Sequence, residues 1–382
     1  MTAPLTATAV WTAADVAAIR HDATTTIPTV PPVTGPVISG RDLWDLWPLQ
    51  LADGSTARVD GWVLWFVLSA PMLSDPEMRH DIARIRLIGA RDGVWRDHGN
   101  ALPDGLNPGS REWAGSALLD PATGQVTLYW TPSGMPGEVR RSYAQRMFQT
   151  TGTLTGTPAD WSITNWSPPR EIAGGPLPHY LQVGASDGVP GYIKGFRDPA
   201  HFRDPADGTR YLLFTGSLRG STSAWNGCIG LLRAEGERWA ALPPLLSADG
   251  LNNEQERPHI VHHAGLYYLF WSTQRKVFAA DGPNGPNGLY GMVADRMTGP
   301  WRPLNGGGLV AGNPDATPFQ TYSWWVTADL TVHAFVDYPG GPFGNQHGDG
   351  GWRRAHFGGI PAPVFTLALD GERTRIIEGP KA

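Results

Sequence analysis

Cysteine and metal-binding patterns are nearly absent from this chain. Cys228 is the single cysteine among 382 residues, which excludes an intrachain disulfide and a site of several thiolates. Its surroundings, CIGLL, are typical of a buried strand, so we expect an inert core thiol and not a nucleophile. The 11 histidines form no HxH or HExxH pattern, and no acidic loop of the EF-hand type occurs. We assign the one cluster, His259 with His262 and His263, to strand and turn surface, and we expect no metal or other cofactor.

A charge excess and long apolar runs are also missing. The 30 basic and 35 acidic residues give a net charge of −5, with Lys and Arg scattered, so we expect no nucleic acid and no membrane as partners. The longest apolar run, near Gly61 to Leu73, is too short to cross a bilayer. The N-terminus lacks a basic start followed by an apolar stretch, which leaves the route of any export open. These features favour a neutral ligand.

Glycine, proline and tryptophan, by contrast, are abundant. The 48 glycines and 35 prolines indicate many turns and short strands, with little helix. Indole faces are surfaces on which sugar rings stack, although many of the 17 tryptophans will belong to the core. The composition therefore favours an all-β protein and tilts the expected ligand toward a carbohydrate.

Five apolar segments recur along the chain as the second arms of predicted hairpins. They are Trp62 to Leu68, Val126 to Trp130, Tyr211 to Phe214, Leu266 to Trp271 and Val332 to Val336. Most follow a compact turn signal such as Asp207-Gly208. Their first residues lie 55 to 85 residues apart. This spacing favours a five-bladed β-propeller over a β-sandwich, whose strands would recur at shorter intervals.

No linker-like stretch divides the chain, so we expect one domain over residues 1–382. Within residues 1–40, a short amphipathic helix is predicted from Val10 to His21, with Thr12 as its N-cap. The Thr- and Pro-rich stretch that follows, residues 24–40, is expected to be an extended lead-in to the first blade.

The first arm of each hairpin carries polar or aromatic residues that are typical of a binding site. In chain order these are Asp45, Arg111 to Trp113, Arg197-Asp198, Glu254 to Arg257, and Gln320 to Tyr322. The innermost strands of a propeller face one channel, so these residues should share a central, funnel-shaped pocket. Asp45 lies between Trp44 and Trp47 at the entry to a buried strand, where an acid is costly unless it has partners or a task.

The tetrapeptide FRDP occurs twice, and only one copy can occupy a first-arm position. Asp198 lies deep enough in its arm to face the channel, whereas Asp204 lies close to the hairpin turn. We therefore expect Asp198 to belong to the site and Asp204 to be a structural turn residue. The adjacent Arg197 is expected to keep Asp198 ionised.

Glu254 and Glu256 are two residues apart, so on a strand they would face the same side. Two like charges raise one another's pKa, which suits a general acid that works near neutral pH. Arg257 and His259 are expected to point to the other side or to the pocket rim. Taken alone, this string would favour an exposed acidic edge paired with Arg257.

Three carboxyl groups in one pocket suit a retaining glycosidase. Such enzymes place a carboxylate nucleophile and a carboxylic acid about 5 to 5.5 Å apart. The strings DLWDLWPLQ, REWAGSALL, FRDP, ERPH and FQTYS, in this order, cover nearly the whole chain. They resemble glycoside hydrolase family 68, the levansucrase, inulosucrase and bacterial β-fructofuranosidase family, whose fold is a five-bladed propeller.

The resemblance implies sucrose as substrate, sugars as acceptors, and a role for each acid. Asp45 matches the nucleophile that forms a fructosyl-enzyme, Asp198 matches the transition-state stabiliser, and Glu256 matches the acid/base. The residues that match the sucrose pocket are Trp44, Arg111, Trp113, Ser116, Arg197, Glu254, Arg257, Gln274 and Tyr322. The resemblance also implies a secreted or extracytoplasmic enzyme.

Three positions depart from the family pattern. Ala114 stands where the family often has Ser, and Asn253 stands where calcium-binding members carry Asp. Gln274 occupies a position where polymer-forming members typically carry Arg or His. We therefore expect no calcium, and hydrolysis or short products in preference to long levan. A non-catalytic sugar-binding propeller and a related furanosidase of family 32 or 43 are the alternatives. The three acids and the ordered WDLW, REWAG and ERPH strings argue against them.

Overall fold

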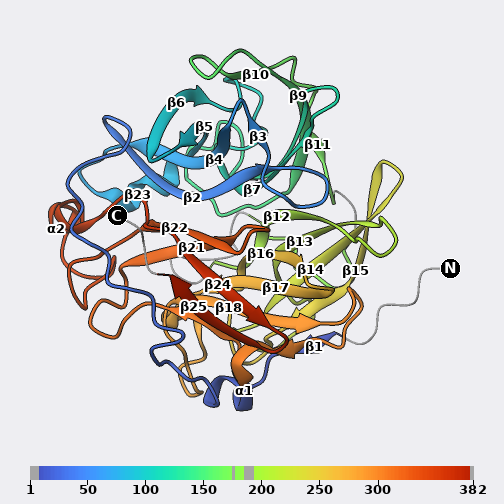
Figure 1. Ribbon diagram of the computed structural model, residues 1–382, viewed down its shortest axis with the longest axis vertical. Coiled ribbons are helices and arrows are strands. Elements are labelled where there is room, and N and C mark those ends of the chain that lie inside the picture. Colours follow the sequence, from blue (N-terminus) through green and yellow to red (C-terminus); the bar gives the residue numbers. More distant parts are fainter. Residues whose placement is uncertain (1–7, 174–176, 185–192, 379–382) are drawn as a thin grey trace.

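Four sheets form a ring of five blades, because parallel pairing of β2 with β7 joins the first two blades into one ten-stranded sheet (Figure 1). The computed structural model describes residues 8–173, 177–184 and 193–378. The first strands of neighbouring blades pack against one another all the way round, in the order β2, β7, β12, β16, β21 and back to β2. This closed ring confirms the predicted five-bladed β-propeller.

The blades follow one another along the chain. Blade 1 contains β2 (Arg41–Gln50), β3 (Arg58–Val59), β4 (Trp62–Pro71), β5 (Arg84–Arg91) and β6 (Val94–Asn100). Blade 2 contains β7 (Arg111–Asp120), β8 (Gln125–Ser133), β9 (Phe148–Thr155), β10 (Ser162–Thr164) and β11 (Arg170–Glu171). Blade 3 contains β12 (Phe196–Arg203), β13 (Arg210–Ser217), β14 (Gly227–Glu235) and β15 (Arg238–Ser247), with β1 (Ala9–Val10) parallel to β15.

Blade 4 contains β16 (Glu256–His263), β17 (Leu266–Thr273), β18 (Gly288–Ala294), β19 (Arg302–Pro303) and β20 (Leu309–Gly312). Blade 5 contains β21 (Thr321–Val326), β22 (Thr331–Val336), β23 (Ile360–Pro361), β24 (Phe365–Asp370) and β25 (Arg373–Glu378). The predicted second arms correspond to β4, β8, β13, β17 and β22, each paired with the first strand of its blade. The predicted hairpins are therefore confirmed.

The hydrophobic core consists of four clusters, each shared by adjacent blades. Second strands such as β13 and β17 are apolar on both faces because a neighbouring blade covers each face. Eleven of the 17 tryptophans are buried, so most of them serve this core and not a ligand. Cys228 is fully buried between blades 2 and 3, and burial raises the pKa of its thiol, as expected of an inert core cysteine.

Short helices lie outside the blades. They are α1 (Ala13–Ala17), α2 (Gly350–His356) and the 3₁₀ turns η1 (Pro76–Asp81), η2 (Arg275–Val277) and η3 (Leu304–Gly306). Thr12 caps α1 as predicted, through a reciprocal hydrogen-bond pair with Asp15. The helix is shorter than predicted because Val10 instead pairs with β15. Within the described ranges, none of the helices is long and apolar enough to cross a membrane.

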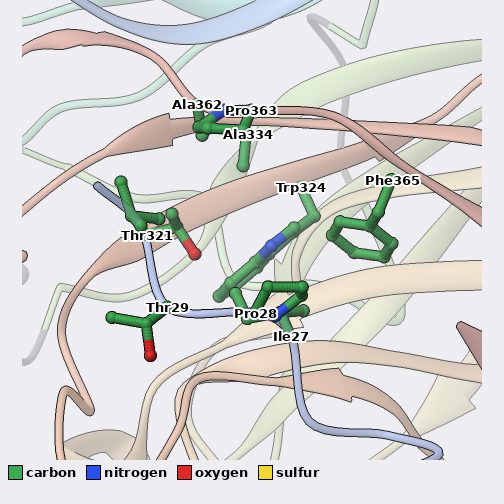
Figure 2. Close-up of a pocket in the computed structure, with 10 residues that line it drawn as sticks. Ile27, Pro28, Thr29, Thr321, Trp324, Ala334, Ala362, Pro363 and Phe365 are labelled. Atoms are coloured by element: carbon green, nitrogen blue, oxygen red, sulfur yellow. The ribbon is translucent and has the colours of Figure 1, made fainter. Parts of the chain in front are cut away.

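The lead-in, residues 24–40, crosses blade 5. The Gln320 side chain accepts a hydrogen bond from Val30 N (3.0 Å) and donates one to Pro28 O (2.9 Å). Ile27 and Pro28 lie beside Trp324 and Phe365 around a cavity of about 20 Å³ (Figure 2). That volume admits one water molecule, so this cavity is a packing gap and not a substrate site.

Every inner strand breaks its register with the second strand of its blade. The breaks fall between Trp44 and Leu46, Trp113 and Gly115, Arg197 and Ala200, Glu256 and His259, and Tyr322 and Trp325. Four residues at these breaks have positive φ: Asp45 (32°), Asp198 (62°), Arg257 (50°) and Ser323 (62°). Such bulges redirect side chains and often occur beside active sites.

In β7 the break requires a glycine. A Cβ atom at Gly115 would lie 1.8 Å from the carbonyl oxygen of Tyr129, and backbone atoms cannot move aside without opening the blade. We expect Gly115→Ala to lower the free energy of unfolding by about 3 kcal/mol or more, at the upper end of overpacking costs. Gly282→Ala, whose Cβ meets nothing nearer than 3.8 Å, is the matched control. Urea denaturation measures both, and equal stabilities would contradict the expectation.

Candidate active site

Three acids from three blades converge at the bulges. Asp45 lies on β2, Asp198 on β12, and Glu256 is the first residue of β16. Glu256 acts electrostatically to raise the pKa of both aspartates, and Asp45 acts in the same way on Asp198. The ring therefore places the three predicted acids in one neighbourhood.

Asp45 lies between two buried tryptophans, Trp44 and Trp47, but is itself partly accessible. The Ser323 hydroxyl donates a hydrogen bond to the Asp45 carboxylate, and Arg257 lies near it as a positive charge. Burial is the larger effect, and it raises the pKa of Asp45. A carboxylate with few partners and partial access suits a nucleophile better than a structural ion pair.

Asp198 is held from several sides. Its N–H donates to Thr131 Oγ1 on blade 2 (2.9 Å). Its Oδ2 accepts from Thr215 Oγ1 (2.8 Å) and from Arg257 N (3.2 Å). Arg197 favours the ionised carboxylate, as predicted, but burial is the larger effect and raises the pKa of Asp198 to about 6. The predicted effect of Arg197 on Asp198 is therefore present, although the effect of burial is larger.

Arg197 joins the two glutamates. Its Nη2 donates to Glu256 Oε1 (2.7 Å) and to Glu254 Oε2 (3.2 Å), and all three side chains are largely buried. Burial, opposed by Arg197, raises the pKa of Glu254 to about 7. A buried cation between two buried acids offsets much of the cost of desolvating them.

The predicted relation of Glu254 to Glu256 needs correction. The sequence suggested that both lie on one strand with their side chains on one side, but β16 begins at Glu256. Glu254 precedes the strand, where its N–H donates to Asn252 Oδ1 (2.8 Å). The two carboxylates meet at Arg197 because of this turn and not because of strand alternation.

Glu256 has a second partner, Tyr322. The Tyr322 hydroxyl donates to Glu256 Oε2, while Arg197 contacts Oε1. Gln274, the N-cap residue of η2, forms a side-chain hydrogen bond with Tyr322. Gln274, Tyr322 and Glu256 therefore form a chain of hydrogen bonds that crosses from blade 4 to blade 5 and back.

The sequence suggested that Arg257 points to the other side of the strand or to the pocket rim, but the structure places it differently. It is buried, and its guanidinium donates to Ser323 O (3.0 Å), Ser323 Oγ (2.7 Å) and Leu46 O (2.6 Å). His259 was expected at the surface but is also buried, with Arg257 O, Val326 N and the Trp325 ring as neighbours. The positive φ of Arg257 breaks the alternation on which both expectations rested.

Arg111 and Ser116 are both buried on β7, the inner strand of blade 2. Arg111 is buried, donates to Glu138 (3.1 Å), and places its guanidinium 5.4 Å from the ring of Trp113, which is only partly buried. Ser116 is fully buried; it donates to Pro199 O (2.9 Å) and accepts from His201 N (3.0 Å). Ser116 thus ties β7 to β12, and a contact of this residue with the sugar stays a prediction.

Some supporting residues gave no signal in the sequence. Thr131 and Thr215 directly follow the apolar segments predicted as second arms, yet both bind Asp198. Gln145 accepts from Phe196 N (3.0 Å) and lies 3.5 Å from the Arg197 guanidinium, although it is about 50 residues away in the chain. Only the stacking of blades brings such residues to the site.

A second region near Trp44 was also missed. The Arg79 guanidinium, on η1, lies 5.4 Å from the Trp44 ring, and His80 makes an edge contact with the same ring at 5.7 Å. Burial raises the pKa of Asp337 to about 7, with Arg79 opposing the shift and Asp45 adding to it. These groups extend the charged neighbourhood from Asp45 toward blade 5.

A cavity of about 430 Å³ lies elsewhere, between the lead-in and the segment around α2, with the Asp42–Arg354 ion pair in its wall. None of the three acids lines it, so the funnel-shaped central pocket stays a prediction. Among the residues that the structure describes, no three His, Cys, Asp or Glu side chains form a metal-binding group.

Comparison with known proteins settles the family. The levansucrase/invertase family, glycoside hydrolase family 68, matches residues 1–224 and 218–379. The chain belongs to this family. A levansucrase of Rahnella aquatilis is 32% identical over 96% of this chain and 93% of its own, and one of Erwinia amylovora is 32% identical over 96% and 94%. An inulosucrase of Halalkalicoccus jeotgali, solved bound to kestose, is 35% identical with a TM-score of 0.89, covering 98% of this chain and 96% of its own.

The resemblance carried by the five ordered strings is thus confirmed. A levansucrase of Gluconacetobacter diazotrophicus, 23% identical over 99% of this chain and 91% of its own with a TM-score of 0.80, shares the fold. The present chain departs from the predicted family pattern at Ala114. The Ala114 carbonyl accepts a hydrogen bond from Thr131 Oγ1 (3.2 Å).

The raised pKa of Asp198 predicts a pH dependence of stability. Its pKa rises from 3.8 to about 6, so between these values the native protein holds a proton that the unfolded chain has released. The free energy of unfolding should therefore fall as pH rises through this interval. Asp198→Asn cannot ionise, so its free energy of unfolding should fall less steeply with pH. Asp207 is exposed, and Asp207→Asn is the control that should keep the slope of the wild type. Urea denaturation at several pH values between about 4 and 7 measures this, and identical slopes for wild type and Asp198→Asn would contradict it.

Proposed function

We propose that this protein is a levansucrase-type fructosyltransferase that cleaves sucrose with retention and transfers fructose to water or to a sugar. The observation that carries the proposal is the convergence of Asp45, Asp198 and Glu256 at the bulges of three inner strands. Membership of the levansucrase/invertase family, and levansucrase relatives that match nearly the whole chain, support it.

In the first step, the Asp45 carboxylate attacks C2 of the fructosyl unit. The bond between C2 and the bridging oxygen breaks, an ester forms on Asp45, and Glu256 gives its proton to the departing glucose. Tyr322 and Arg197, which grip the two oxygens of Glu256, fix the direction of this transfer. In the second step Glu256 takes a proton from the acceptor hydroxyl, whose oxygen attacks C2 and releases Asp45.

Asp198 stabilises the positive charge that develops on the fructosyl ring in both transition states. Thr215 and the Arg257 N–H hold one of its oxygens, Oδ2, so the orientation of the carboxylate is set before substrate binds. The ionised form is required, and with a pKa of about 6 this carboxyl group is largely ionised at neutral pH. Arg197 and Arg257 limit the repulsion among the acids.

Incubation with sucrose tests the proposal. Released glucose shows cleavage, free fructose shows hydrolysis, and oligosaccharide or polymer shows transfer. A sugar-binding propeller without catalysis would release no glucose, and that outcome would reject the enzyme. A location outside the cytoplasm stays a prediction from the family resemblance.

Each acid should be essential for turnover but not for folding. We expect Asp45→Asn, Asp198→Asn and Glu256→Gln each to lower kcat by several orders of magnitude with the fold intact, because each group acts in the transition state. Asp204→Asn, in the second FRDP copy, is the control. Asp204 follows β12 and accepts from Tyr267 Oη (2.6 Å), so its loss should weaken the fold by about 1.5 to 3 kcal/mol while activity persists.

Initial rates on sucrose and thermal unfolding curves measure these effects. Near-normal turnover with an unchanged melting curve in any of the three acid variants would remove that residue from the site. A dead but folded Asp204→Asn would show that the two FRDP copies have been assigned the wrong way round.

The residue at position 274 should influence the products. A neutral hydrogen bond holds an acceptor sugar less strongly than a charged one, and a loss of about 1.4 kcal/mol would reduce transfer relative to hydrolysis about tenfold. Gln274 is also engaged with Tyr322, which reduces its freedom to bind an acceptor. We expect hydrolysis and short products from the wild type, and a larger share of transfer from Gln274→Arg and Gln274→His.

The ratio of free fructose to glucose, with product sizing, measures this share. Arg275→Gln and Lys276→Gln are the matched controls, since both side chains are exposed neighbours on η2. Abundant high-mass levan from the wild type, or an unchanged ratio in both Gln274 variants, would refute the expectation. A change in Lys276→Gln alone would transfer the role to Lys276, which acts electrostatically on Glu254.

A further inference from the structure

Lys194 binds three oxygens from two loops. Its Nζ donates to Asn226 Oδ1 (2.7 Å), to Asn253 Oδ1 (2.7 Å) and to the carbonyl oxygen of Ala224. An ammonium group has three N–H donors, so this set uses all of them. The shell consists of neutral amide oxygens. Burial lowers the pKa of Lys194, and the charges of Glu254 and Asp249 oppose this shift.

The two asparagine side chains are oriented for this task. Asn226 uses its NH₂ group to donate to Leu218 O (3.0 Å), and Asn253 uses its own to donate to Ile193 O (3.2 Å). Their oxygens are thereby turned toward the ammonium. The three oxygens surround a point-like cation, a geometry that suits lysine and not the flat fork of arginine.

A lysine at this position is notable because the chain has only three lysines among its 30 basic residues. The contacts that Lys194 makes at its backbone and at its ammonium group show why its position matters. Lys194 lies two residues before β12, where its carbonyl oxygen accepts from Gln145 Nε2 (2.7 Å). The same Gln145 side chain accepts from Phe196 N and lies beside Arg197.

At the other end of the bridge, Asn253 directly precedes Glu254 and lies 3.4 Å from its carboxylate. Lys194 therefore links the start of β12, which carries Arg197, to the segment that delivers Glu254 and Glu256. The Arg197 contacts to those two glutamates cross the same gap between blades 3 and 4.

We propose that Lys194 is a positioning residue whose ammonium serves as a built-in cation, holding the segment before β16 against the start of β12 and so aligning Glu256 with Arg197. The inference rests on the proposed function of this site. A bound metal ion is not needed for this link, because the oxygens that could take one already hold the ammonium.

The test is removal of the cation followed by chemical rescue. Lys194→Ala should lower kcat on sucrose about tenfold to a hundredfold through misalignment of the acid, with a smaller change in KM. Added methylammonium, which restores a compact N–H donor, should recover part of that loss. Tetramethylammonium at equal concentration carries the charge without N–H donors and should recover none. Lys194→Arg should remain impaired.

Arg233→Met is the matched control, because it removes a cation from blade 3 that pairs with exposed Glu235 near the strand end. It should behave like wild type. Chelator should leave the melting temperature of the wild type unchanged. Wild-type turnover by Lys194→Ala, or equal rescue by both ammonium salts, would overturn the proposal, as would a fall of several degrees on chelation.

Hydrogen exchange provides a readout that does not depend on sucrose. In Lys194→Ala, exchange should rise in residues 193–197 and 252–256 and stay unchanged in β15 at the outer side of blade 3. Unchanged exchange in both segments would overturn the proposal. Absence of sucrose cleavage by the wild type would instead reject the proposed function, and with it the catalytic part of this inference.

Discussion

Two buried arginines make this site feasible. Four acids lie close together at the centre of the ring, and each buried carboxylate is costly unless an opposite charge accompanies it. Arg197 binds Glu254 and Glu256 directly, and Arg257 lies beside Asp45 and donates through its backbone to Asp198. The compensation is incomplete, since burial still raises the pKa of several of these acids.

The bulges explain how a regular architecture produces an irregular centre. Second strands such as β13 and β17 are buried on both faces, whereas every inner strand breaks its register with the second strand at its polar residue. Residues at positive φ, such as Asp45 and Asp198, persist in strained conformations only where the surroundings fix them. The packed blades provide those surroundings. The propeller therefore brings strained backbone and charged side chains together at the bulges of the inner strands.

Contacts between blades, more than contacts within them, complete the site. Thr131 of blade 2 binds Asp198 of blade 3, and Ser116 ties the same two blades together. Tyr322 of blade 5 binds Glu256 of blade 4. Asp198 and Glu256 are therefore each held by a neighbouring blade, so loosening one blade should disturb acids carried by the next.

The sequence by itself determined the hairpins, the five blades and the positions of the three acids, because apolar periodicity and turn residues are local signals. It also identified the family. Only the tertiary structure decided how Glu254 meets Glu256 and why Arg257 is buried. These predictions assumed regular alternation along each strand, and the bulges break it. Lys194 left no signal at all, since its partner Asn226 lies in the loop between β13 and β14 and its partner Asn253 lies in the segment before β16, and only folding brings them together.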